Sequence, residues 1–389
     1  MKIKYQLVVI GNNATYKKDV VDSFLLRVEE LGLEKDSAKI IDDTNFLIDY
    51  KANSPTVCLY FGKGGLYTNI DILDKLITDA VFILPIVSDL NNFSSLIPPQ
   101  LLSINGFKLN DLKDIEAVVA RIMEGLSLLR TSRRLFISYR RIESRSIAIQ
   151  LYEHLDQCGF DVFLDTHSIR PGDVFQDELW HRLVDTDVVV LLDTPGFLKS
   201  EWTEKELAKA SAMSIGVLQL IWPNHKQTAY STLCYPLYLT ENDFEENDYT
   251  TPSANLTIES LKTINSDVES LRARSLASRQ DNLIQEFTAT AKKMKVVANL
   301  QPEKFITVIR KDGKELAIIP TVGVPQAFTY NQTEELIKRI REHNLPEIFL
   351  LYDHRNIIEK WQKHLTWLDL YLPIKAVKIT EIENWMLKI

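Results

Sequence analysis

Short, continuous apolar runs recur along the chain, and they constrain its fold more than any other feature. Val57–Phe61, Val81–Val87, Val188–Leu192 and Ile215–Ile221 all have strand length and are almost entirely apolar. A strand that is apolar on both faces is typical of a parallel sheet covered by helices on both sides. Amphipathic helical segments separate these runs, so the sequence predicts an α/β protein built on doubly wound sheets.

Residues 1–130 alternate strands and helices and are expected to form an N-terminal α/β domain. Asp19–Leu31 and Ile70–Ile77 each place apolar residues on one helical face. The Gly62–Gly65 turn follows a strand, but it lacks the spacing of a phosphate-binding loop and has no Ser or Thr after Lys63. A plain turn is therefore expected there.

The region after His225 is expected to hold an acidic loop and a helical linker, residues 227–300, followed by a C-terminal α/β domain, residues 301–389. Ile258–Phe287 has helical periodicity, with a break or bend expected near Ser266. Acidic residues alternate with its arginines, which favours a solvated helix face over a basic patch. These arginines are Arg272, Arg274 and Arg279. In the C-terminal domain, Asp312-Gly313 between two apolar runs predicts a β-hairpin.

Length and charge narrow the class of protein. A chain of 389 residues exceeds one compact core, so two or three domains are expected. The net charge of −8 disfavours a nucleic-acid partner. Because no signal peptide or apolar run of about 20 residues is present, we expect a cytoplasmic protein with no membrane partner. No metal site is expected either, because Cys58, Cys158 and Cys234 are spread too widely, and Asp353, His354 and His364 lack the spacing of metal ligands.

Residues 132–226 carry the most specific motifs. In a doubly wound sheet the ligand crevice lies at the carboxyl ends of the strands. Three segments are expected to emerge at that edge: Ser138–Arg141, Asp165–Gly172 and Pro195–Trp202. The sequence therefore predicts a ligand site built from these loops.

Four segments of this region resemble, in order, the signature motifs of the TIR (Toll/interleukin-1 receptor) domain. They are Phe136–Arg141, Gly159–Asp165, Ile169–Gly172 and Ser200–Leu207. The resemblance implies a central flavodoxin-like domain, a parallel sheet with helices on both faces, between the two further α/β modules. The α/β pattern of residues 1–130 suggests a degenerate TIR-like or nucleotide-binding sensor domain there, although this region has no Trp-x-x-x-Glu motif.

Catalytic TIR domains cleave NAD+ and carry a glutamate four residues after a tryptophan, which here is Glu206 after Trp202. The resemblance thus implies an NAD+ glycohydrolase of the nucleosidase or ADP-ribosyl cyclase type. It would release nicotinamide and ADP-ribose or a cyclic ADP-ribose, with NAD+ as substrate and no cofactor. Thr203 replaces a cysteine that often follows the tryptophan, a change that retains the carboxylate.

A single carboxylate suits this reaction. Glycosidases need two because a poor leaving group must be protonated, whereas nicotinamide leaves a pyridinium as a neutral base. Glu206 would stabilise the positive charge that develops on the ribose, and the i, i+4 spacing puts Trp202 on the same helical face. Arg140 or Arg141 would bind the pyrophosphate through a guanidinium fork.

The remaining candidates for substrate binding are Ser138, Tyr139, Asp165 and Ile169. Structural roles are open alternatives for most candidates: Trp202 as a core residue, Asp165 as a loop cap, and the two arginines as surface charges. Glu206 could likewise be one more exposed carboxylate of its helix.

The resemblance further implies a bacterial antiviral or cell-death effector that is activated by self-association of its TIR domain, in response to a sensor or trigger protein. The main alternative is a non-catalytic TIR scaffold that assembles signalling complexes through the Ile169–Gly172 loop. A third alternative is a nucleotide sensor acting through residues 1–125.

Overall fold

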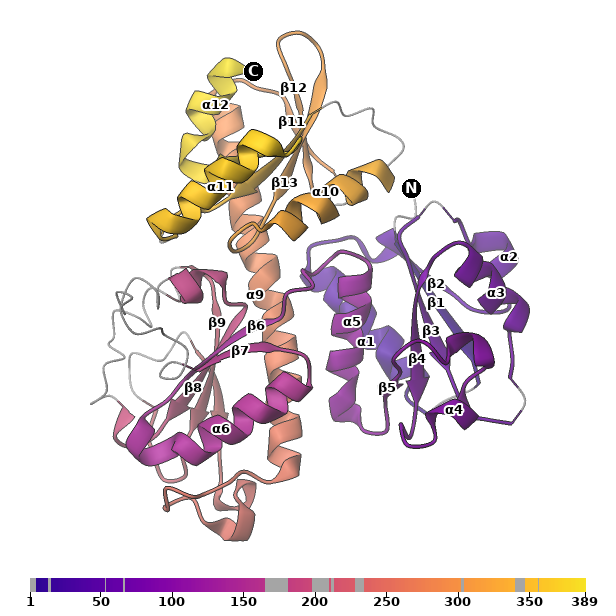
Figure 1. Cartoon of the computed structure of the whole chain (residues 1–389), viewed down its shortest axis with the longest axis vertical. Helices are drawn as coiled ribbons and strands as arrows, with labels where there is room; N and C mark the ends of the chain where they lie inside the picture. The colour runs from indigo at the N-terminus through magenta and orange to yellow at the C-terminus, as the bar shows by residue number, and fades with distance from the viewer. Residues whose placement is uncertain are drawn as a thin grey trace. The chain divides into compact units, whose positions relative to one another are not determined.

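The structure is a computed structural model of the 389-residue chain. It describes residues 5–12, 15–52, 54–65, 67–164, 181–197, 210, 213–227, 234–301, 304–339, 347–355 and 357–389. The chain divides into two compact units. Unit 1 comprises Met1–Thr131 and Lys262–Ala273, and unit 2 comprises Ser132–Leu261 and Arg274–Ile389. Three five-stranded sheets with flanking helices make this an α/β protein, as expected (Figure 1).

The N-terminal sheet is parallel throughout, with strand order β2-β1-β3-β4-β5. Its strands are β1 (Tyr5–Gly11), β2 (Ala38–Ile41), β3 (Thr56–Phe61), β4 (Phe82–Val87) and β5 (Phe107–Lys108). The helices of this module are α1 (Lys17–Glu30), α2 (Phe46–Asp49), α3 (Ile70–Thr78), α4 (Phe93–Leu96) and α5 (Ile115–Gly125). Alternation along β1 sends Val8 and Ile10 into one core with Leu73 and Leu76 of α3. Helices α1 and α5 pack together, and α5 covers the opposite face of β3 (Figure 1).

Close packing explains the glycines that follow β3. A Cβ atom at Gly62 would lie 2.6 Å from the carbonyl oxygen of Leu96. At Gly64, where φ is +81°, it would lie 3.0 Å from the carbonyl oxygen of Ser95. The Gly64 N–H also donates to the Leu96 carbonyl over 3.1 Å. These glycines are therefore needed for the close approach of two backbone segments.

The central sheet has the same topology as the N-terminal one, because its strands are all parallel in the order β7-β6-β8-β9-β10. Its strands are β6 (Arg134–Ser138), β7 (Asp161–Leu164), β8 (Val188–Asp193), β9 (Gly216–Ile221) and β10 (Tyr235–Tyr238). Helix α6 (Arg141–Gln157) follows β6. The boundary expected at residue 226 falls short of β10, which pairs with β9. As a short, largely exposed edge strand that contains Pro236, β10 has little apolar signal in the sequence.

The C-terminal sheet is mixed, with strand order β11-β12-β13-β14-β15. Its strands are β11 (Ala298–Leu300), β12 (Ile306–Ile309), β13 (Glu315–Pro320), β14 (Ile348–Tyr352) and β15 (Lys375–Lys378). The first three are antiparallel and the last three parallel. The expected hairpin joins β12 to β13, with Gly313 at φ +80°. Its helices are α10 (Ala327–Arg339), α11 (Glu359–Tyr371) and α12 (Ile382–Lys388).

Helix α9 (Ile258–Lys293) runs for 36 residues without a break, so the bend expected near Ser266 is wrong. The solvated arginine face is also wrong for two of its three members. Within unit 1, Arg272 is 0 % exposed, and its Nη1 donates to Glu124 Oε1 over 2.8 Å. Within unit 2, Arg279 donates to two backbone carbonyls, whereas Arg274 is exposed. Charge alternation along one helix does not reveal partners that come from distant segments.

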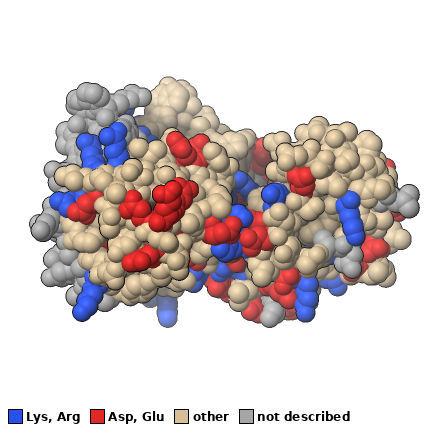
Figure 2. All heavy atoms as spheres, turned by 90° about the horizontal axis from the view of Figure 1, so that it is seen from below, with Lys and Arg blue, Asp and Glu red and all other residues tan. Residues whose placement is uncertain are grey.

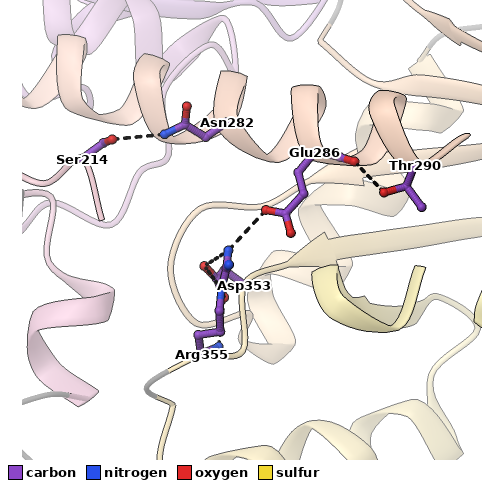
Figure 3. Close-up of polar contacts among 6 residues, drawn as sticks. All are labelled: Ser214, Asn282, Glu286, Thr290, Asp353 and Arg355. Carbon is purple, nitrogen blue, oxygen red and sulfur yellow. Dashed lines mark hydrogen bonds and ion pairs between the residues drawn. The ribbon is translucent and has the colours of Figure 1, made fainter. Parts of the chain in front are cut away.

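Within unit 2, α9 makes polar contacts with both the central and the C-terminal modules (Figure 3). Asn282 Nδ2 donates to Ser214 Oγ, just before β9, over 3.1 Å. One turn later, Glu286 Oε2 accepts from Arg355 Nη2 over 3.3 Å. Arg355 Nη2 also forms an ion pair with Asp353 Oδ2 at 2.8 Å. The carboxylate of Asp353, considered above as a metal ligand, is therefore part of an ion pair. The part of α9 that begins at Arg274 therefore packs within unit 2.

The described surface carries charges of both signs. Figure 2 shows acidic and basic side chains interspersed on one face. Among the helices that the structure describes, none has the length and apolar character required to cross a membrane.

Candidate functional site

The carboxyl end of β6 contributes two of the residues expected to line a site. Ser138 is the last residue of β6 and lies beside Leu191 of β8 in the register. Its hydroxyl is fully buried and has no hydrogen-bond partner among the described residues. Tyr139 is buried as well. A buried hydroxyl that lacks a partner is unusual and marks this strand end as a place where a polar group could bind.

The two arginines that follow have different surroundings. Arg140 occupies the N-cap position of α6, and its Nη1 forms an ion pair with Glu143 Oε1. Arg141, the first residue of α6, is exposed. Arg140 is thus held by a carboxylate at the edge of the sheet.

Glu143, which the sequence motifs did not single out, lies at the same edge of the sheet. Its Oε2 accepts a hydrogen bond from the Gly196 N–H over 3.1 Å, so it ties α6 to the loop after β8. Burial opposes ionisation, but hydrogen bonds from Thr194 and Gly196 and the charge of Arg140 outweigh it and lower the pKa of Glu143. The i, i+3 spacing from Arg140 was the available signal.

A second missed residue, Asp193, ends β8 at the same edge. Its carboxylate accepts from Gln219 Nε2 over 2.7 Å and lies 3.2 Å from His225 Nε2. Burial raises the pKa of Asp193, although His225 and Gln219 partly offset the shift. Burial and the nearby Asp193 also raise the pKa of the Cys234 thiol to about 11. The available sequence signal for Asp193 was its place as an acidic residue at the end of an apolar run.

Four expected site residues, Glu206, Trp202, Asp165 and Ile169, lie outside the described residues. The segment that contains Trp202 and Glu206 has a buried residue at each end, Phe197 and Ala210. These two residues belong to one core cluster, together with Phe136 and Leu191 of the sheet. Both ends of this segment are therefore attached to the face of the sheet on which Leu191 lies.

Comparison with known protein families identifies the central module. A family model described as TIR domain matches residues 135–237. These residues form a TIR domain. The match includes β10, and it confirms the resemblance carried by the sequence motifs. It does not extend into the two flanking modules.

Two curated relatives resemble the TIR domain over part of their length. A probable 2′ cyclic ADP-D-ribose synthase of Brachypodium distachyon is 35% identical over 74 residues, which are 19% of this chain and 33% of the relative. A 2′ cyclic ADP-D-ribose synthase of Bacteroides thetaiotaomicron is 28% identical over 88 residues, which are 23% of this chain and 31% of the relative. The chain thus spans about a third of the length of these relatives.

The TIR sheet brings some of the expected residues together and separates others. Ser138, Arg140 and the loop at 194–197 lie at the carboxyl edge, where Glu143 joins Arg140 to Gly196. Tyr139 lies one residue beyond the end of β6 and is buried. Arg140 and Glu143 connect α6 to the loop that leads toward Trp202 and Glu206.

Proposed function

We propose that the TIR domain cleaves NAD+ between nicotinamide and ribose. The observation that carries this proposal is its similarity to two proteins named as 2′ cyclic ADP-D-ribose synthases. Such a product contains the ADP-ribose portion of NAD+ without nicotinamide. The charged carboxyl edge of the TIR sheet, with Arg140 and a buried serine hydroxyl, supports the same conclusion.

In the proposed reaction the C1′–N bond breaks, and its electron pair stays on the nicotinamide nitrogen. A new C1′–O bond forms to water or to a hydroxyl of the same molecule, and the attacking oxygen loses a proton to solvent. Glu206 stabilises the oxocarbenium-like transition state, and Trp202 packs over the substrate. Arg140 binds the pyrophosphate. No cofactor is required, because the pyridinium itself provides a neutral leaving group.

Further residues and properties belong to this proposal. Ser138, Tyr139, Arg141, Asp165 and Ile169 contribute to the substrate site. The protein acts in the cytoplasm as an antiviral effector, and a sensor or trigger protein promotes self-association of the TIR domain. Neither a membrane nor a nucleic acid is involved. The product is either linear or cyclic ADP-ribose, and residues 1–130 serve as a TIR-like or sensing module.

The test is the release of nicotinamide from NAD+ by the purified full chain over a range of protein concentrations. We expect turnover that rises more steeply than the protein concentration, because self-association activates the enzyme. Glu206→Ala should lower turnover about 100-fold or more. Glu204→Ala, a carboxylate two residues earlier, is the matched control and should retain activity.

No nicotinamide release at any concentration would exclude the enzyme and leave the non-catalytic scaffold. Equal turnover by Glu206→Ala and the wild-type chain would instead exclude the role of Glu206. Nucleotide binding that persists without turnover, and is lost only on substitution within residues 1–125, would favour the sensor.

A further inference from the structure

Asp193 is a buried carboxylate at the carboxyl end of the central strand β8. It is 2 % exposed, and both of its oxygens have a neighbour. Oδ2 accepts from Gln219 Nε2 over 2.7 Å, and Oδ1 lies 3.2 Å from His225 Nε2. Removing a carboxylate from water costs several kcal/mol unless partners compensate. The side chain is therefore held by a dedicated set of partners.

The hydrogen bonds extend beyond these partners. Gln219 Oε1 accepts from Gln227 Nε2 over 2.9 Å, and the Tyr238 hydroxyl donates to Gln227 Oε1 over 3.2 Å. The backbone carbonyl of Asp193 also accepts from the Trp222 N–H over 3.2 Å. This network connects the carboxyl ends of β8, β9 and β10. It therefore holds the end of β8 on the side where β9 lies, and β6 lies on the other side of β8.

The loop that follows Asp193 is anchored from its other side by α6. The Gly196 N–H donates to Glu143 Oε2, and the Phe197 N–H donates to the Thr194 carbonyl over 2.9 Å. Phe197 is buried in the core cluster of the sheet. Residues 194–197 thus lie between the carboxylates of Asp193 and Glu143, and each carboxylate has its own partners. Glu206 follows Phe197 by nine residues.

We propose that Asp193 is a positioning residue for the reaction of the TIR domain. Its carboxylate fixes the start of the loop from which the chain leads to Trp202 and Glu206. The proposal rests on the proposed function, because it assigns Glu206 the central role in NAD+ cleavage. Displacement of a reacting group by about 1 Å can lower a rate about 100-fold, so a fixed loop origin matters for the rate.

Asp193→Asn provides the test, because it preserves the shape of the side chain but removes its charge and replaces one of its two acceptor oxygens with an NH2 group. We expect kcat for nicotinamide release to fall about tenfold. KM for NAD+ should change less than about twofold, since the ion pair of Arg140 is untouched. A merely structural role would lower the thermal midpoint and leave the kcat of the folded protein unchanged.

Asp187→Asn is the matched control. Asp187 is also fully buried, but it lies immediately before β8, at the amino edge of the sheet rather than the carboxyl edge. Asp187→Asn should retain kcat. A kcat that falls equally in both variants, or in neither, would overturn the positioning role of Asp193.

Hydrogen exchange of the full chain gives a readout that does not depend on activity. Amide exchange in peptides from residues 194–210 should be faster in Asp193→Asn than in the wild-type chain, and unchanged in Asp187→Asn. An inactive wild-type protein would refute the proposed function, and the exchange data would still decide the role of Asp193. Unchanged exchange in Asp193→Asn would refute it.

Discussion

The N-terminal sheet and the TIR sheet have the same parallel strand order, yet their carboxyl edges differ in chemistry. The first strand ends in Gly11 in one and in Ser138 in the other. The third strand ends in the buried, apolar Phe61 in one and in the buried Asp193 in the other. The loop that follows the third strand contacts the backbone of Leu96 in the first case and the carboxylate of Glu143 in the second.

This difference shows that topology creates the opportunity for a site, and the residues at the strand ends determine whether one exists. Glycines at the N-terminal edge allow close backbone packing. At the TIR edge, charged side chains are held in place by each other and by the loop after β8. Gly62→Ala, Gly196→Ala and Glu143→Gln test this contrast between a packed edge and a charged edge, and Arg272→Met tests a buried charge of the N-terminal unit.

The largest expected effect concerns stability of the N-terminal unit. Arg272→Met removes a fully buried guanidinium that donates to Glu124 Oε1 and to the carbonyl of Arg130. We expect the free energy of unfolding of unit 1 to fall by about 3 kcal/mol, because Glu124 and the carbonyl lose a buried partner. Chemical denaturation of the full chain measures this change. Arg274→Met, at an exposed arginine of the same helix, should cost less than about 1 kcal/mol.

A matched pair of glycine substitutions separates packing from function. Gly62→Ala forces a Cβ against the Leu96 carbonyl, so we expect a loss of about 1–3 kcal/mol in stability and unchanged NAD+ turnover. Gly196→Ala instead meets the side-chain ends of Arg140 and Glu143, which can move. Its stability should be nearly unchanged, whereas KM for NAD+ should rise about tenfold as the guanidinium is displaced. Thermal melts and steady-state kinetics should be measured on both variants. Equal changes in stability and in KM for the two variants would contradict the contrast between the two edges.

The smallest expected effect is a pH dependence at the charged edge. The pKa of Glu143 is lowered in the folded protein, because hydrogen bonds and the charge of Arg140 outweigh burial. A lowered carboxylate pKa stabilises the fold above the ordinary value of 4.5 and loses this contribution as the pH falls through the folded value. The difference in thermal midpoint between wild type and Glu143→Gln should therefore be largest near neutral pH and shrink below about pH 4.5. Glu153→Gln, at an exposed carboxylate of α6, is the control, and a difference that grows in acid would contradict the assignment.

Much of the fold could be predicted because its signals are local. Apolar runs marked β3, β4, β8 and β9, and the Asp312-Gly313 pair marked the hairpin of the C-terminal sheet. The edge strand β10 was missed because an exposed strand needs no apolar pattern. The buried role of Arg272 was missed because its partner Glu124 lies far away in the chain.

The candidate site was predictable only in part. Motifs placed Ser138 and Arg140 where the first strand of the TIR sheet ends, because motif spacing is a property of the sequence itself. The roles of these residues and of Trp202 and Glu206 stay predictions. Glu143 and Asp193 were missed, since their partners Gly196, Gln219 and His225 come from other strands and loops.

The sequence by itself determined the α/β class and the presence of a TIR domain, because apolar periodicity and motif order are local features of the chain. Only the tertiary structure decided which buried charges have partners and how the edge of the TIR sheet is held. Ion pairs and hydrogen bonds such as those of Arg272, Glu143 and Asp193 join residues that are distant in sequence. Their energies depend on burial and on distances between atoms, which exist only once the chain has folded.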